Sequence, residues 1–286
     1  MNRLLSIIPV LFLLVGLHSC APSAPEEQRV VTVSIEPLRY VVEQIAGKDV
    51  EVNVLTPAGA SPETYQPTPR QLVDLDKSEA YIKVGTLGFE RTRLEQMVAN
   101  TSHLLQVNAS AGIDSLPDAC SSHDHASDGS DPHTWMSCAN MRKIAANVCE
   151  ALCQEDTARV DEYTHNLAAF KQKIDSVESV VKSTLANVKC RTFLIYHPAL
   201  GYFARDYGLR QLSVEQDGKE PSAARIAQLI DDCRRDSVRV IFIQKEHAGR
   251  AARRISETTG IPVVEINPLA YQWDEQMVNI AKALAK

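Results

Sequence analysis

The segment VDEYTHNLAAFKQKIDSVESVVKSTL, residues 160–185, decides how this chain folds. Apolar or aromatic side chains recur along it at spacings of three and four, the period of one face of an α-helix. Between Pro132 and Pro198 there is neither glycine nor proline to interrupt a helix. We therefore expect one long amphipathic helix within residues 154–189. Its stripe consists of residues 160, 163, 167, 170, 174, 177, 181 and 185.

The same stripe would also suit the arm of a coiled-coil dimer. It lasts fewer than about four heptads, and the charges beside it show no clear pairing pattern. We favour packing within one chain, which makes this helix a rigid connection between two parts of a monomer.

Strand-like runs alternate with helix-compatible stretches on both sides of the long helix. With 286 residues, 44% of them hydrophobic, the chain can bury the cores of two domains. This order predicts an α/β fold with two parallel-sheet lobes, residues 30–153 and 190–286, joined by the long helix. The expected strands cover residues 30–35, 50–55, 80–84, 104–107, 192–196, 209–214, 238–244 and 262–266.

The start of the chain is typical of a bacterial export signal. The apolar run 4–17 follows a basic residue and is too short to span a bilayer comfortably. A small residue, Ser19, precedes Cys20, as lipoprotein processing requires. We predict a signal peptide in 1–19, lipid attachment at Cys20 and a flexible tether in 20–29; a secretory signal with an incidental cysteine is the alternative. The protein would then be exported and anchored to a bacterial membrane, facing the periplasm, without crossing it.

The formal net charge of −6 and the lack of a basic stripe argue against nucleic-acid binding. An exported protein can form disulfides, and Cys120 and Cys138 could staple the polar loop between them. The alternative is that most cysteines are small buried hydrophobes. No CxxC pair occurs, so a structural zinc cluster is not expected. The cysteines beyond Cys20 are Cys120, Cys138, Cys149, Cys153, Cys190 and Cys233.

Three polar residues stand in loops beside prolines, where a strand ends or a helix begins. They are Glu63 after Pro62, His133 after Pro132, and His197 before Pro198. Each alone is more often exposed or structural than a ligand. Together, two imidazoles and one carboxylate suit a divalent transition metal, so we predict one metal site assembled from distant loops.

These segments, in this order, resemble the ZnuA/TroA-like (cluster A-I) zinc- and manganese-binding solute-binding lipoproteins of ABC importers. The resemblance spans nearly the whole mature chain. It implies a metal site in the cleft between the lobes, and a monomeric receptor, not an enzyme, that delivers its metal to a permease with an ATPase. The matching segments are PAGASP at 57–62, DPHTWM at 131–136, YHPALGYF at 196–203 and NPL at 267–269.

Carried over by position, the resemblance assigns the metal ligands. Glu63 stands where the family usually has His, followed by His133 and His197, and Asn267 stands where it usually has Asp. Asn267 lacks a negative charge and offers only a weak amide oxygen, so water, Glu265 or Asp274 could replace it. Zinc is the first choice because two imidazoles favour it over manganese, with Mn²⁺ or Fe²⁺ as alternatives.

The loop with His123, Asp124 and His125 resembles a shortened form of the family's His-rich loop, which implies auxiliary metal capture; a solvated linker is the alternative. Two further functions compete with the receptor. A zinc hydrolase could use the same ligands, but no HExxH motif occurs and no general base is evident. An adhesin would leave the three loop ligands unexplained.

Overall fold

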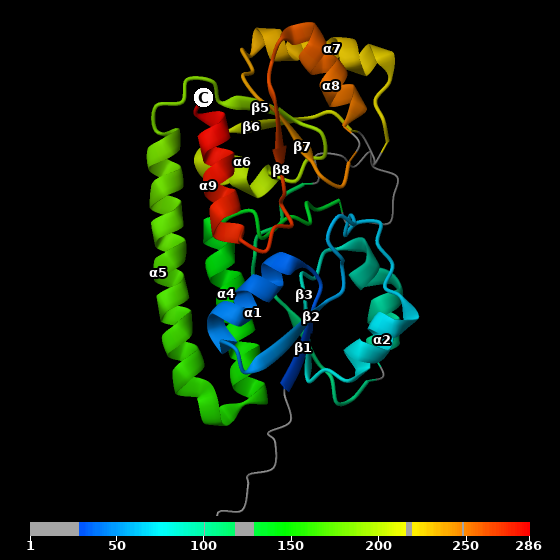
Figure 1. The fold of residues 1–286 in the computed structure, drawn as a ribbon, viewed down its shortest axis with the longest axis vertical. Coiled ribbons are helices and arrows are strands. Elements are labelled where there is room, and N and C mark those ends of the chain that lie inside the picture. The colour runs from blue at the N-terminus through cyan, green and yellow to red at the C-terminus, as the bar shows by residue number, and fades with distance from the viewer. Residues whose placement is uncertain (1–28, 100, 118–128, 216–218, 248) are drawn as a thin grey trace, which may run out of the picture.

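A computed structural model describes residues 29–99, 101–117, 129–215, 219–247 and 249–286. Two four-stranded parallel sheets form two lobes, one below the other in Figure 1. Their strand orders are β2-β1-β3-β4 and β6-β5-β7-β8, which confirms the predicted two-lobed α/β fold. The strands are β1 Arg29–Val33, β2 Val50–Val54, β3 Ala80–Lys83, β4 Leu105–Asn108, β5 Thr192–Ile195, β6 Arg210–Ser213, β7 Ile241–Gln244 and β8 Val263–Ile266.

Helices cover the sheets and connect the lobes (Figure 1). In the first lobe and the connection they are α1 Glu36–Ala46, α2 Pro69–Asp76, the π-helical turn η1 Glu90–Leu94, α3 Glu95–Val98, α4 Cys138–Glu155, the 3-10 turn η2 Thr157–Arg159 and α5 Val160–Leu185. The second lobe has α6 Gly201–Tyr207, α7 Ala223–Arg235, α8 Arg250–Thr259 and α9 Trp273–Leu284.

The long helix α5 has 26 residues and runs alongside both lobes (Figure 1). Its predicted stripe, apart from the exposed Val160, is the face that packs against α1, α4 and α9, with side chains such as Phe170 and Ile174 buried. The helix thus packs within its own chain. It begins later than residue 154, because Asp156 leaves helical geometry and its side chain accepts a hydrogen bond from Ala158 N.

One apolar core runs from the first sheet along α5 into the second lobe. It includes Ile45 on α1, Ile174 on α5, Phe242 on β7 and Met277 on α9, all fully buried. A second core lies under α7 and α8, on another part of the second sheet. Each large side chain buried in this way contributes about 1.5–3 kcal/mol. The two lobes are therefore joined along α5 by continuous apolar packing.

Two buried indoles also connect the lobes. Trp135, which precedes α4, donates from Nε1 to the carbonyl oxygen of Pro268 at 2.8 Å. Trp273, the first residue of α9, donates from Nε1 to the carbonyl oxygen of Trp135 at 2.7 Å. Both indoles are almost fully buried, so these bonds are shielded from water.

The cysteines of the described segments carry free thiols. Cys138, Cys149 and Cys233 are buried, as expected for small hydrophobes, and Cys153 and Cys190 are partly buried. Tyr207 donates to the Cys138 sulfur at 3.4 Å, and burial raises the pKa of that thiol to about 11. Cys120 lies outside the described residues.

The predicted signal peptide, Cys20 and the tether up to residue 28 also lie outside the described residues. Arg29, the last residue of the predicted tether, already belongs to β1 and forms ion pairs with Glu79 and Asp156 at 2.8 and 2.9 Å. Within the described segments, no helix combines the length and the apolar character needed to cross a membrane.

Candidate metal centre

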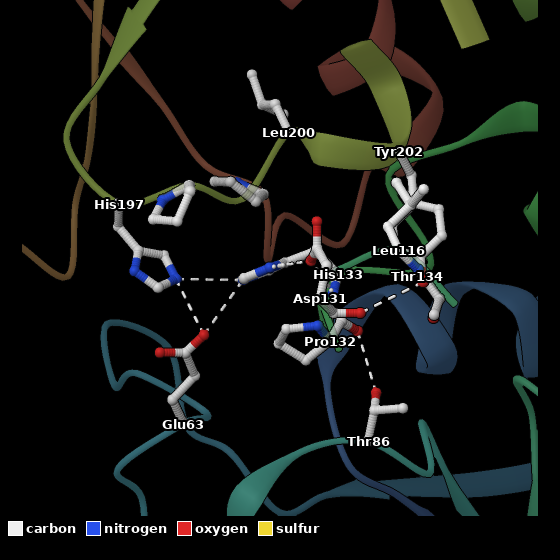
Figure 2. Close-up of polar contacts among 12 residues, drawn as sticks. Glu63, Thr86, Leu116, Asp131, Pro132, His133, Thr134, His197, Leu200 and Tyr202 are labelled. Atoms are coloured by element: carbon white, nitrogen blue, oxygen red, sulfur yellow. Dashed lines mark hydrogen bonds and ion pairs between the residues drawn. The ribbon is translucent and has the colours of Figure 1, made fainter. Parts of the chain in front are cut away.

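The structure brings the three predicted loop residues together between the lobes (Figure 2). Glu63 lies in the loop between β2 and α2, and His133 lies in the turn before α4. His197 follows β5 in the other lobe, at the carboxyl end of a parallel strand, where α/β folds commonly bind ligands. Segments separated by more than sixty residues therefore share one site.

The backbones that carry the two histidines are fixed locally. Ser137 caps α4 by accepting a hydrogen bond from Asn140 N at 3.0 Å, which sets the turn containing His133. The side chain of Gln244, at the end of β7, donates to the carbonyl oxygen of His197 at 2.5 Å and accepts from its N–H at 3.3 Å. Each imidazole thus starts from a constrained position.

Three ligand atoms converge at spacings that fit a bound metal ion. His197 Nε2 lies 3.3 Å from His133 Nε2 and 3.1 Å from Glu63 Oε1, and His133 Nε2 lies 3.7 Å from the same oxygen. Zinc bonds of about 2.0–2.1 Å in a tetrahedron separate ligand atoms by about 3.3 Å. The residues present therefore fit such an ion without rearrangement of the backbone.

A carboxylate orients each imidazole from behind. His133 Nδ1 donates to Asp131 Oδ1 at 2.9 Å, and His197 Nδ1 donates to Glu215 Oε1 at 3.0 Å. Both carboxylates are almost fully buried. Because the Nδ1 atoms are engaged, both histidines present Nε2 to the site, which is the usual arrangement around metal-binding imidazoles.

In the metal-free protein, the neighbouring carboxylates favour a protonated His197, and the histidines favour an ionised Glu63. Burial would lower the pKa of His197, but hydrogen bonds to Glu215 and Glu63 raise it to about 10. Burial would raise the pKa of Glu63, but the hydrogen bond with His197 and the charges of both histidines lower it to about 2. A proton on His197 Nε2 would occupy the lone pair that a metal ion needs, and metal binding would displace it.

The cavity beside these atoms measures about 20 Å³. This is room for one water molecule or one bare ion, not for an organic ligand. Its walls come from both lobes and include Trp135 and Pro268, which are joined by the indole hydrogen bond described above. The residues that line the cavity are Ser61, Pro62, His133, Trp135, His197, Ala199, Gln244, Glu246, His247, Pro268 and Leu269.

The other predicted ligands do not join this cluster. Asn267 Oδ1 accepts a hydrogen bond from Leu269 N at 3.0 Å, and its side chain lines a neighbouring cavity of about 400 Å³. Glu265 is exposed on β8. Asp274 forms an ion pair with Lys173 Nζ at 2.8 Å, on the α5–α9 contact. His123, Asp124 and His125, the predicted auxiliary ligands, lie outside the described residues.

Two residues of the site were not found from the sequence. Glu215 follows β6, and His247 follows β7; with His197 they form a second group whose ligand atoms lie within 4.8 Å of one another. The sequence signal that could have identified them is their position directly after strands of the same parallel sheet, where α/β folds bind ligands. Neither stands beside a proline, the feature that singled out the other three.

The family model of ZnuA, the zinc-uptake complex component A, periplasmic, matches residues 31–286. The chain belongs to this family. The assignment agrees with the motifs of the three ligand loops and confirms the resemblance predicted from them.

Individual ZnuA-like proteins share the fold over most of the chain. The high-affinity zinc uptake system protein ZnuA of Bacillus subtilis is 25% identical over 280 residues, which cover 93% of this chain and 88% of that protein. A crystal structure of ZnuA superimposes with a TM-score of 0.84 at 32% identity, covering 91% of this chain and 98% of the other. Zinc-binding lipoprotein AdcA of Streptococcus pneumoniae is 24% identical over 254 residues, 84% of this chain and 50% of AdcA, so the chain spans about half of that relative.

Proposed function

We propose that this protein is the solute receptor of an ABC importer and binds one divalent transition metal, zinc as the first choice, between its lobes. The observation that carries the proposal is the convergence of Glu63 Oε1, His133 Nε2 and His197 Nε2 from two lobes at 3.1–3.7 Å. Two relatives are named for zinc binding and for zinc uptake, which supports zinc as the metal.

The ligand set favours zinc over the alternatives. Two imidazoles and one carboxylate suit Zn²⁺, which accepts nitrogen and oxygen ligands in a tetrahedron. Mn²⁺ prefers oxygen-rich sites, and Fe²⁺ accepts two histidines and a carboxylate if further positions stay open. The cargo could therefore also be manganese or iron, and competition between the ions is the relevant test.

Metal binding would exchange a proton for an ion that connects the lobes. The ion replaces the proton on His197 Nε2 and is held from the other lobe by Glu63 and His133. Because the apolar core along α5 already joins the lobes, we expect movement to be confined to the ligand loops. The permease and its ATPase would recognise the loaded surface, while lipid at Cys20 keeps the receptor at the membrane, facing the periplasm.

The small cavity argues against a hydrolase. A catalytic zinc site needs room for a substrate directly beside the ion, and the cavity lined by His133 and His197 measures only about 20 Å³. The relatives are named for zinc binding and uptake, not for an enzymatic activity. We therefore expect no turnover of peptide or ester substrates by the zinc-loaded protein.

The deciding experiment titrates the soluble chain, from residue 24 onward, with Zn²⁺, Mn²⁺ and Fe²⁺ in competition with a chelator. We expect one tight equivalent of zinc, lost in Glu63→Ala and in His197→Ala. His165→Ala is the matched control, because it removes an exposed histidine on α5, away from the site. Preference for manganese or iron would reassign the cargo, and the absence of tight binding by the unmodified chain would refute the proposal.

A further inference from the structure

We propose that His247 supplies the fourth ligand to the metal, at the position that Asn267 leaves unfilled; this inference rests on the proposed function. His247 lines the same small cavity as His133 and His197, whereas Asn267 lines the neighbouring one. The first three ligands leave one corner of a tetrahedron open. His247 is the remaining histidine of the described cavity wall.

The ring of His247 is held beside the cluster. It stacks on His197 with the ring centroids 4.9 Å apart and the planes 20° from parallel. Its backbone N–H donates to the carbonyl oxygen of Gln244 at 3.2 Å, and Gln244 itself fixes the backbone of His197. One turn at the end of β7 thus positions both histidines relative to each other.

Glu215 faces both rings with one carboxylate. Its Oε1 accepts from His197 Nδ1 at 3.0 Å, and its Oε2 lies 3.8 Å from His247 Nδ1. An outer carboxylate that engages Nδ1 leaves Nε2 as the ligand atom. Glu215 hydrogen-bonds to His197 but approaches His247 only to ion-pair distance, so it draws Nδ1 of His247 toward itself and leaves Nε2 available for the metal.

His247 needs a short movement to reach the ion. It belongs with His197 and Glu215 to one group of ligand atoms, but not to the group formed by Glu63, His133 and His197. Its side chain is 21% exposed, and its ring lies 5.4 Å from that of Tyr196, so movement toward the ion would exchange ring contacts with Tyr196 and His197 for a bond to the metal.

Asn267 is a poor competitor for this position. Its Oδ1 already accepts the hydrogen bond from Leu269 N, which shapes the turn after β8. An amide oxygen also binds zinc more weakly than imidazole. With His247, the site would contain three imidazoles and one carboxylate, a set that favours zinc over manganese more strongly than two imidazoles do.

The test counts imidazole ligands directly. Zinc K-edge absorption of the unmodified, zinc-loaded chain should show three imidazoles in the coordination shell, and His247→Phe should show two. Phe keeps a ring to stack on His197 but cannot bind metal. We expect His247→Phe to lower zinc affinity more than about tenfold. Asn267→Ala is the matched comparison and should change neither the imidazole count nor the affinity.

The outcomes separate this inference from the proposed function. Two imidazoles in the unmodified protein, or an unchanged count in His247→Phe, would overturn the role of His247 while zinc binding through His197 stands. Failure of the unmodified chain to bind zinc would instead refute the receptor itself. If His247→Phe does not fold, as judged by circular dichroism, His247→Ala and the count in the unmodified protein still decide.

Discussion

The lobes meet in two regions that differ in chemistry, the spine formed by α4, α5 and α9 and the metal face formed by the ligand loops. The spine is apolar, with Phe170 and Ile174 buried in a core shared by both lobes. The metal face instead brings together Glu63, His133 and His197, with carboxylates behind both imidazoles. The lobes therefore stay together without an ion, and the ion acts only on the metal face.

This difference separates stability from metal affinity. Apolar contacts on the spine stabilise the folded chain whether or not a metal is present. Polar groups on the metal face stabilise the folded chain mainly when a cation is bound to them, because a ligand that binds only the folded state stabilises that state. Substitutions in the two regions should consequently affect different measurements.

The largest expected effect is on the spine. Phe170 is 3% exposed on α5 and packs edge-on against Tyr40 of α1, with the ring centroids 5.7 Å apart. Phe170→Ala should lower the free energy of unfolding by about 3–5 kcal/mol through lost contacts and a cavity. Denaturant unfolding of the metal-free protein measures this free energy of unfolding. Val180→Ala, at a 43% exposed position on the same helix, should change it by less than about 0.5 kcal/mol.

Zinc affinity of folded Phe170→Ala should equal that of the unmodified protein. A large drop in affinity would show that the spine and the metal face are coupled, and the separation would fail.

The next effect concerns charge on the metal face. Glu63→Gln keeps the side-chain volume but removes the negative charge among the three converging ligands. Zinc affinity should fall more than about 100-fold, beyond the range for an outer partner. Chelator competition measures the affinity, with Glu265→Gln, at an exposed position on β8, as the control. Equal affinities in Glu63→Gln and the unmodified chain would remove Glu63 from the site.

A smaller effect is expected from the carboxylates behind the imidazoles. Asp131→Asn and Glu215→Gln should each lower zinc affinity about 10–100-fold, because the imidazoles lose their fixed orientation and part of their basicity. Similar losses would show that both lobes prepare their histidine in the same way. An unchanged affinity in either variant would mean that packing alone orients that ring.

The smallest effect is a pH dependence on the spine. Burial would raise the pKa of Asp274, but the hydrogen bond and the positive charge of Lys173 lower it overall. The resulting stability is present above the unfolded pKa of about 3.9 and is lost as the pH falls through the lower folded value. Asp274→Asn should therefore be less stable than the unmodified chain at pH 6, by under about 1 kcal/mol, with the difference vanishing toward acid.

Denaturant midpoints of both proteins between pH 6 and 2 measure this dependence. A difference that grows toward acid would contradict the sign. Zinc affinity at neutral pH should be the same in both proteins, since Asp274 lies on the spine.

The sequence predicted the elements whose pattern is local. The stripe of α5 has the helical period, and the buried face follows it from Tyr163 to Leu185. Glu63, His133 and His197 could be singled out because each stands beside a proline in a loop between elements. Such features can be recognised without knowing which strands are neighbours.

What the sequence did not predict depends on strand order or on buried polar contacts. Glu215 and His247 reach His197 because β6 and β7 flank β5, an order that spacing along the chain does not encode. The π-helical turn at Glu90 was also missed. Its buried carboxylate accepts hydrogen bonds from Val84 N and Gly85 N at 2.8 and 2.7 Å, a role that a lone glutamate in a sequence does not reveal.

The paired indoles give this molecule an optical property. Trp135 and Trp273 are its two tryptophans, and both lie buried where the lobes meet, with the His133 ring 5.3 Å from that of Trp135. All indole emission of the unlabelled protein therefore originates at this boundary. An ion bound at His133 would change the electric field around one emitter, so the fluorescence colour and yield would report metal binding without any dye.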